Sequence, residues 1–201
     1  MYHIEPEILS QVQIGNQEAF THLVESYQRP VYNLCYRMLG DAVEAEDASQ
    51  ETFLRVYKNI KYYDHKRPFS TWLLSIAAHY CIDLLRKRRM VMISMDSHPY
   101  LDIPDGAPGP ETAYHVMEDQ KRVQTMLKSL SPHDRAAVVM YYWYDFSYEE
   151  IAQSLSLTVS AVKSRLHRAR ITLAQTWQEQ GMNNFSVKRN VERKTHESPA
   201  F

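Results

Sequence analysis

Hydrophobic side chains return every three or four positions through most of the chain, which is the period of an amphipathic α-helix. In the first half this pattern predicts a short helix from Pro6 and a second from Asn16 to Gly40. It predicts a third helix over 42–60 and a long fourth one, capped by Ser70, that runs into a basic stretch at 86–89. Helices joined by such short connections are expected to pack as antiparallel neighbours.

Residues that start or stop helices support these limits. Asn16 is a suitable N-cap, and Asp41 with Glu44 three positions later matches a capping box. Gly40 is placed where a helix ends in the left-handed conformation. Pro30 lies inside the second stripe and is expected to kink or interrupt that helix, because proline lacks the backbone N–H.

The second half begins with a change of composition. Residues 96–110 are rich in Asp, Pro, Gly and Ser, which is typical of an extended linker. Helical periodicity returns near Glu111, and Ser131 followed by Pro132 predicts an N-cap with proline at the first helical position. The prediction is an all-α protein of two small helical domains joined by a flexible acidic linker, the second domain containing a helix-turn-helix. The predicted limits are 1–94, a linker at 95–115, 116–178 and a disordered tail at 179–201.

Charged residues are distributed unevenly along the chain. The net charge of −1 hides opposed blocks: residues 1–27 carry four acids and no Lys or Arg, whereas 163–170 carry four bases and no acid. Such segregation suits a protein that meets polyanions at some surfaces and basic or apolar partners at others.

Several classes of protein are disfavoured. Cys35 and Cys81 stand in apolar helical contexts without metal-ligand spacing, so both are expected to be buried thiols in a reducing compartment. No stretch has the length of a membrane span or the form of a signal peptide, which favours a cytoplasmic protein without membrane insertion. Taken alone, Glu44, Glu46, Asp47 and Glu51 could suggest a metal or carboxylate active site, but Glu44 and Glu46 diverge around the helix and no His lies at ligand spacing. We therefore expect no metal, cofactor or catalytic site.

A helix-turn-helix is predicted between residues 147 and 173. Ser147 with Glu150 forms a capping box, residues 156–158 form the turn, and the usual turn glycine is absent. At about 100° per residue the second helix has a buried stripe of Val162, Leu166, Ala169 and Leu173.

The opposite face of that second helix carries the residues expected to contact the DNA major groove, with base-edge groups at its centre and cations beside them for phosphates. These are Ser160, Lys163, Ser164, His167 and Arg168. Arg165 and Arg170 lie nearer the buried boundary, where structural ion pairs or contacts to backbone phosphates are expected before base contacts. The alternative is an ordinary solvated basic face.

Two stretches resemble a known family. Residues 130–132 (LSP), 147–152 (SYEEIA) and 162–170 (VKSRLHRAR), together with Arg135, resemble the fourth conserved region of bacterial sigma-70 factors, most closely the extracytoplasmic-function (ECF) group. Residues 45–55 (AEDASQETFLR) and 69–73 (FSTWL) resemble the second region of that family. Together the resemblance covers about residues 10–178, with both regions in the family order.

The resemblance implies a partner for the first domain. In such factors the helix over 47–57 docks on the clamp coiled coil of core RNA polymerase, and the polymerase flap is the other core contact. The residues implied are Asp47, Gln50, Glu51, Phe53, Leu54 and Tyr57. An anti-sigma protein is the usual regulator in the group.

The resemblance also implies that the loop over 61–67 and the following helix open and hold the minus-ten element. Rings for unstacked bases and cations for the backbone suit this role. The implied residues are Tyr62, Tyr63, Lys66, Arg67, Trp72, Arg86 and Arg88. Core packing is at least as good an interpretation for Phe69 and Trp72, whereas Tyr62 and Tyr63, in a polar loop, are the better base contacts.

Two departures from the family pattern bear on specificity. His79 stands where the family commonly has an Asn in the pocket for an extruded base, with Asp83 four residues later. Histidine has one donor and one acceptor when neutral but two donors when protonated, so base preference at the minus-ten element is expected to differ. Ser160-Ala161 replaces a common Gly-Thr at the start of the recognition helix.

The sequence therefore predicts an alternative sigma factor, a non-enzymatic subunit that gives RNA polymerase its promoter specificity. Two rivals remain open at this point. A stand-alone helix-turn-helix regulator would bind duplex DNA tightly without polymerase, and a nuclease using the carboxylates near Asp47 would require a metal.

Overall fold

A computed structural model describes residues 4–95 and 111–196, with side chains described for 4–90 and 120–179. The described chain is helical and contains no strand, which confirms the all-α prediction. The first half holds α1 (Pro6–Gln13), α2 (Gln17–Leu39), α3 (Ala42–Asn59), a 3-10 turn η1 (Ile60–Tyr62) and α4 (Phe69–Met95). The second holds α5 (Glu111–Lys128), α6 (Pro132–Tyr144), α7 (Tyr148–Ser154) and α8 (Val159–His196). The acidic stretch at 96–110 lies outside the described residues.

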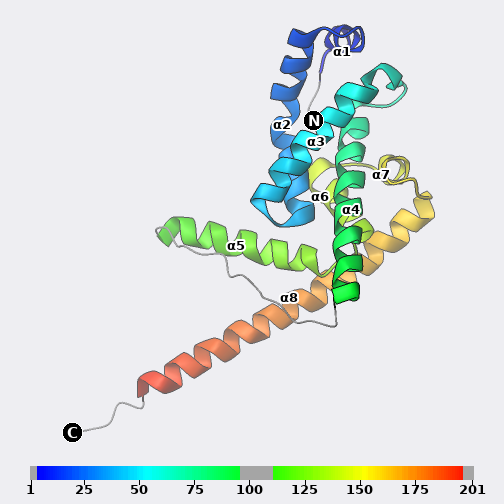
Figure 1. Ribbon diagram of the computed structural model, residues 1–201. Helices are drawn as coiled ribbons and strands as arrows, with labels where there is room; N and C mark the ends of the chain where they lie inside the picture. Colours follow the sequence, from blue (N-terminus) through cyan, green and yellow to red (C-terminus); the bar gives the residue numbers. More distant parts are fainter. Residues whose placement is uncertain (1–3, 96–110, 197–201) are drawn as a thin grey trace.

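The N-terminal body consists of α1 to α4, in which α2, α3 and α4 pack on one another around a shared core (Figure 1). Leu23, Leu34, Val56 and Leu73 are fully buried there. Cys35 and Cys81 are both buried and free, as predicted. They are also neighbours: a hydrogen bond with Cys35, followed by burial, raises the pKa of the Cys81 thiol, which makes it a poor nucleophile.

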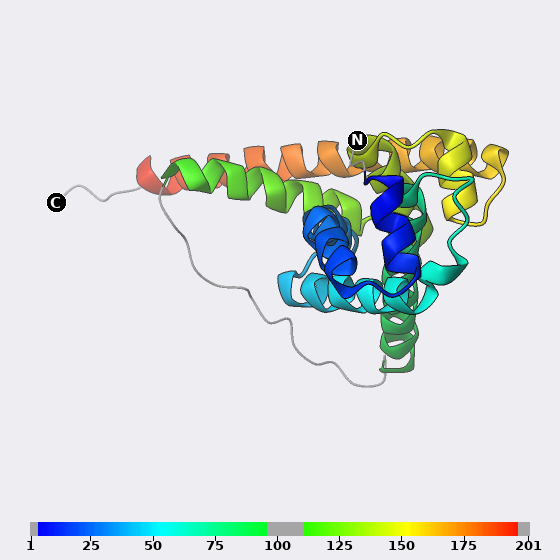
Figure 2. The same ribbon diagram turned by 90° about the horizontal axis from the view of Figure 1, so that it is seen from above.

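The C-terminal body consists of α5 to α8. Helices α6, α7 and α8 pack together around Val139, Ile151 and Leu166. Helix α5 contacts α8 where Arg122 lies 4.4 Å from the Trp177 ring centroid, and both helices extend toward the same side of the molecule (Figure 2). The two bodies also touch, because α6 packs against both α2 and α4, and α7 packs against α4. Their apolar side chains form one continuous core.

Most of the predicted helix signals are confirmed. The Asn16 side chain accepts a hydrogen bond from the Ala19 N–H at 3.1 Å. Gly40 has a φ of 76°, in the left-handed region where glycine carries no steric penalty. Ser131 caps α6 and Pro132 takes its first position.

Pro30 lies inside α2 and does not interrupt it, and Val31 and Leu34 continue the buried stripe beyond it; the alternative of a kink stays a prediction. Two local predictions are wrong. Helix α4 begins at Phe69, one residue before the predicted cap Ser70. At α3 only half of the capping box forms: Asp41 accepts from the Glu44 N–H at 2.9 Å, while the Glu44 carboxylate pairs with Arg88.

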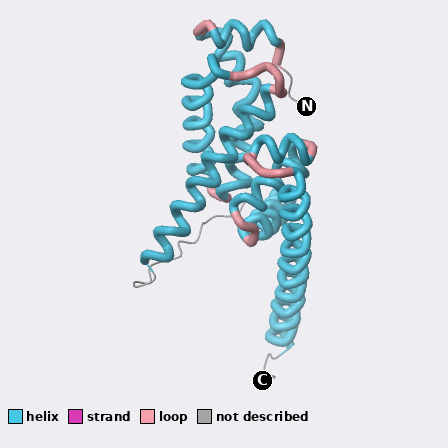
Figure 3. Tube along the Cα trace, turned by 90° about the vertical axis from the view of Figure 1, so that its right-hand side faces the viewer, coloured by secondary structure: helices cyan, strands magenta, loops and turns pink. Residues whose placement is uncertain are grey.

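The C-terminal prediction is also corrected. Helix α8 continues to His196, past the predicted start of disorder at residue 179, and extends away from the rest of the chain (Figure 3). The loss of apolar periodicity after Trp177 does not mark the end of the helix, because no proline interrupts residues 178–196.

Candidate nucleic-acid and polymerase interfaces

The helix-turn-helix begins with a complete capping box. The Ser147 N–H donates to Glu150 Oε2 at 2.9 Å, and the Glu150 N–H donates to Ser147 Oγ at 3.1 Å. In the turn, Ser156 has a φ of 54°, so a serine occupies the left-handed conformation where the glycine was expected. Thr158 then caps α8 by accepting from the Ala161 N–H at 3.1 Å. These caps fix the entry of both helices without the glycine.

The two faces of α8 separate as predicted. Val162, Leu166 and Ala169 are at most 1% exposed and pack into the core, whereas Leu173, predicted to belong to the same buried stripe, is only partly buried. The side chains of the opposite face are all exposed: Ser160, Lys163, Ser164, His167 and Arg168. The α8 face formed by these five residues is therefore available to a ligand, with hydroxyl and imidazole groups flanked by two cations.

The two arginines at the boundary differ from each other. Arg165 Nη1 lies 2.9 Å from Asp134 Oδ1, and both side chains are partly buried. This ion pair ties α8 to the start of α6 and confirms the structural role predicted for Arg165. The Arg170 Nε–H donates to the Leu166 carbonyl at 3.1 Å, and its guanidinium is otherwise exposed.

The two tyrosines of the loop before α4 differ in exposure: Tyr62 faces solvent and Tyr63 is buried. Tyr62 is 73% exposed, with Lys61 Nζ 5.0 Å from its ring centroid. Tyr63 is only 6% exposed; its ring lies 5.4 Å from that of Phe69 and 5.2 Å from that of Trp72, and its hydroxyl donates to the Arg67 carbonyl. The predicted exposure of Tyr63 is therefore wrong. Phe69 and Trp72 are core residues too, at 5% and 8% exposed.

Beside this loop is a cavity of about 650 Å³. Its apolar wall comes from the segment before α1, from α1, α2 and the loop, and from the start of α4, and its basic side chains come from the loop. The lining includes Ile4, Leu9, Tyr27, Tyr63, Phe69, His65, Lys66 and Arg67. Burial raises the pKa of Tyr27 to about 12, so its hydroxyl stays protonated. Sequence reasoning missed Ile4, Leu9 and Tyr27 because their helical spacing indicates only core packing.

His79 is exposed on α4, and its orientation is fixed by one contact. Nδ1 lies 2.8 Å from the Ser75 carbonyl, which can only accept, so Nδ1 carries the proton. Neutral His79 therefore offers Nε2 to a ligand as an acceptor. Asp83 and Arg86 are exposed further along α4. Arg88, predicted to contact the backbone, is instead paired with Glu44 across α3 and α4.

The predicted polymerase face on α3 is mostly open. Asp47 and Gln50 are exposed, and the apolar side chains of Leu54 and Tyr57 are 55% and 50% exposed on the same helix. The Glu51 carboxylate is engaged by Arg55 Nε at 2.8 Å. Phe53 is 8% exposed, so it packs mainly within the body.

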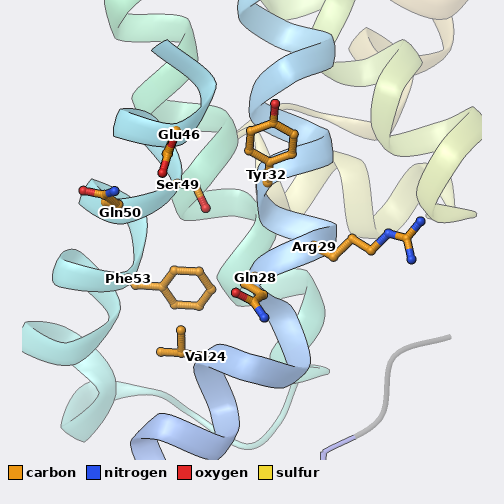
Figure 4. A pocket seen from close by; sticks show the side chains of 8 residues that line it. All are labelled: Val24, Gln28, Arg29, Tyr32, Glu46, Ser49, Gln50 and Phe53. Carbon is orange, nitrogen blue, oxygen red and sulfur yellow. The ribbon is translucent and has the colours of Figure 1, made fainter. Parts of the chain in front are cut away.

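A groove of about 590 Å³ extends this face onto α2, lined by Val24, Gln28, Arg29, Tyr32, Glu46, Ser49, Gln50 and Phe53. Figure 4 shows the Phe53 ring directed from α3 toward Gln28 of α2, with Val24 below it and Arg29 pointing away. The sequence-based prediction included Gln50 and Phe53 of the α3 wall and none of the α2 wall. The signal was weak, since Gln28 and Tyr32 are spaced like ordinary surface positions between core residues.

Within the described part of the chain, no cluster of three His, Cys, Asp or Glu side chains is placed to hold a metal ion. Glu44 and Glu51 are instead engaged by arginines. A search of the described helices also finds none long and apolar enough to cross a membrane.

The chain matches two families over the parts where these surfaces lie. Residues 23–90 match sigma-70 region 2, and residues 120–173 match sigma-70 region 4. The chain is 37% identical over 172 residues to the ECF RNA polymerase sigma factor SigW of Bacillus subtilis, covering 82% of this chain and 92% of SigW. It is 36% identical over 159 residues to the ECF sigma factor SigE of Mycolicibacterium smegmatis, covering 78% of this chain and 62% of SigE.

Solved structures give a consistent result. CnrH, solved in complex with the cytosolic domain of CnrY, matches with a TM-score of 0.63 and 25% identity over 86% of this chain and 96% of CnrH. The sigma factor RpoE of Bartonella quintana, solved with the anti-sigma factor NepR, shares the fold with a TM-score of 0.62 and 20% identity over 79% of this chain and 96% of RpoE.

The chain is therefore a member of the sigma-70 family of RNA polymerase sigma factors, within the ECF group. It is an alternative sigma factor that directs promoter-specific transcription initiation with core RNA polymerase, and it is not itself an enzyme. This identification sets aside both the stand-alone regulator and the nuclease.

Proposed function

We propose that the two bodies divide promoter recognition between them. The C-terminal body, over about 116–178, binds the minus-thirty-five element through Ser160, Lys163, Ser164, His167 and Arg168, with Arg170 on the phosphate backbone. The observation that carries this proposal is the exposed α8 face opposite a fully buried stripe. Arg165 holds α8 against α6 through its ion pair with Asp134.

The N-terminal body, over 1–94, melts and holds the minus-ten element. Exposed Tyr62 supplies a stacking surface, and Lys66, Arg67 and Arg86 supply cations for the backbone. His79 and Asp83 contact an extruded base, with His79 Nε2 as the acceptor. Tyr63 and Trp72 shape the loop from inside and are left out of the contact set because their rings are buried.

Core polymerase binds the same body on its α3 side. Asp47, Gln50 and Glu51 make polar contacts to the clamp coiled coil, while Leu54, Tyr57 and the groove around Phe53 take its apolar side chains. The C-terminal body meets the polymerase flap. An anti-sigma protein regulates the factor in the cytoplasm, a proposal supported by CnrH, which was solved with a cytosolic CnrY domain.

Purified core polymerase tests these assignments separately. Asp47→Ala with Leu54→Ala should reduce co-elution with core, whereas Lys163→Ala with Arg168→Ala should leave co-elution intact and reduce minus-thirty-five-dependent transcript. Glu179→Ala, exposed on α8 beyond the residues assigned to either surface, is the matched control. Equal loss of core binding in both double variants would refute the division of roles.

A further inference from the structure

A cavity of about 610 Å³ lies where α2 packs against α5 and α6. Its lining includes Tyr32, Tyr36, Arg37, Gln120, Gln124 and Trp143. Tyr32 is the one lining residue that it shares with the groove beside Phe53, and its lining includes none of the residues proposed to contact DNA. A volume of this order at the junction of packed units is typical of small-molecule sites. The proposed function leaves this cavity without a role.

Three aromatic side chains form flat walls in the cavity. The rings of Tyr32 and Tyr36, one turn apart on α2, are nearly parallel, with 6.2 Å between their centroids and 10° between their planes. Trp143 lines the α6 side and is 39% exposed. Aromatic rings bind flat heterocycles by stacking. The walls therefore favour a planar aromatic ligand over an aliphatic one.

Gln124 places an unpaired acceptor in the lining of the cavity. Its Nε2 donates to the Tyr36 carbonyl at 3.2 Å, and since a carbonyl can only accept, this contact fixes the orientation of the amide. Its Oε1 is buried and has no hydrogen-bond partner among the described residues. Buried acceptors of this kind are rare in folded proteins. A carboxamide pairs its oxygen with the adenine N6 amino group and its N–H with adenine N7, so Gln124 fits an adenine ring.

Arg37 supplies a cation beside the aromatic walls. Its guanidinium carbon lies 5.0 Å from the centroid of the Trp143 ring, and its Nη1 donates to the Asn33 carbonyl at 3.1 Å. In the described part of the chain Arg37 forms no ion pair with a carboxylate, whereas Arg55 and Arg165 do. A guanidinium that is held in place and keeps further N–H groups is suited to bind a phosphate.

We propose that this cavity binds an adenine nucleotide. The adenine ring stacks on the aromatic walls, its N6 amino group donates to Gln124 Oε1, and its phosphate contacts Arg37. The lining comes from α2, α5 and α6, so the nucleotide contacts both bodies at once. This site adds a response to the adenine nucleotide pool to the proposed function and does not depend on how promoter recognition is divided.

Calorimetric titration of the full-length chain with AMP, ADP and ATP tests the proposal and distinguishes the three sources of this chemistry. At least one of them should bind saturably to a single site. GMP should bind at least about tenfold more weakly, because guanine presents an acceptor where adenine presents its N6 amino group. Adenosine should also bind more weakly than AMP, since it lacks the phosphate that contacts Arg37.

Two variants separate the ring contact from the phosphate contact. Gln124→Leu should reduce AMP affinity by about tenfold and abolish the preference over GMP. Arg37→Gln should reduce AMP affinity toward that of adenosine and leave adenosine binding unchanged. Gln153→Leu, exposed on α7, and Arg122→Gln, whose guanidinium lies 4.4 Å from the Trp177 ring centroid outside the cavity, are the matched controls and should bind AMP like the wild type.

The DNA-binding face is a rival site for any nucleotide, because it carries exposed cations. Lys163→Ala with Arg168→Ala should therefore bind AMP like the wild type. Loss of binding in that double variant would overturn the proposal, as would equal affinity for AMP and GMP or no saturable binding of any adenine nucleotide. Unchanged AMP binding in Gln124→Leu would overturn it even if Arg37→Gln did not fold. None of these titrations uses promoter or polymerase, so their failure leaves the proposed function standing.

Discussion

The two bodies present their proposed DNA-binding residues in different ways. In the C-terminal body they stand on one regular helix, where the 3.6-residue period puts the buried stripe and the exposed face on opposite sides. In the N-terminal body they come from a short loop and from α4, and an aromatic cluster beneath the loop decides which rings are exposed. A helical face can therefore be inferred from spacing alone, whereas a loop surface depends on tertiary packing.

The largest expected effect is a loss of stability from substitution on the buried face of α8, the regular helix that carries the DNA-binding face of the C-terminal body. Leu166 is 1% exposed, and Leu166→Ala should lower the free energy of unfolding by about 2–5 kcal/mol through lost burial and a cavity. Ile171 is 48% exposed on the opposite face of the same helix, so Ile171→Ala should change the free energy of unfolding by less than about 0.5 kcal/mol. Urea unfolding followed by circular dichroism measures both, and similar losses would contradict the assigned faces.

Substitutions of Tyr62 and Tyr63 should have different effects, because only the exposed Tyr62 ring can stack on a DNA base. Tyr62→Ala should weaken binding of the polymerase holoenzyme to single-stranded minus-ten DNA by about 1–3 kcal/mol without changing stability. Tyr63→Phe should instead destabilise the fold by about 1 kcal/mol, since it removes the hydrogen bond to Arg67, and leave DNA binding unchanged. Fluorescence anisotropy and thermal unfolding check the two, and a DNA-binding loss in Tyr63→Phe alone would reverse the assignment.

Salt dependence should report the phosphate contacts of α8. Each cation removed in Lys163→Ala and Arg168→Ala should reduce the slope of log affinity against log salt by about one, measured on minus-thirty-five duplex. His167→Ala should change sequence preference with little change in slope. Slopes equal to that of the wild type in all three variants would contradict the proposed phosphate contacts of Lys163 and Arg168.

The smallest expected effect is a pH dependence at His133. Burial, followed by the charges of Arg165 and Arg86, lowers its pKa below 6.5, so the folded chain holds the neutral imidazole. As pH falls through 6.5, the unfolded chain takes up a proton that the folded chain does not, and stability decreases. His133→Gln should flatten this part of the stability profile between pH 7.5 and 5.5. A profile unchanged by the substitution would show that His133 titrates alike in both states.

The sequence predicts most of the helices and the polarity of α8 because caps and stripes are local. Asn16, Ser131 and Ser147 act within three residues of themselves, so their roles can be inferred without the fold. The pairing of Glu44 with Arg88 and the burial of Tyr63 depend on helices that meet only after folding.

The contact between the two bodies could not be inferred from the sequence either. Arg135 donates hydrogen bonds to main-chain carbonyls. Every residue has such a carbonyl, so residue types do not indicate which ones Arg135 will contact. The same holds for the groove on α2 beside the predicted polymerase face. Its residues become part of that face only because α2 packs against α3.

The most direct test of the central claim is transcription with purified core polymerase on a library of promoters randomised at both elements. The expected transcripts depend on this chain, with His167→Ala relaxing selection at minus thirty-five alone and His79→Asn changing selection at minus ten alone. Transcripts without selection at either element, or His79→Asn leaving the minus-ten preference unchanged while His167→Ala alters the minus-thirty-five preference, would contradict the proposed division of promoter recognition.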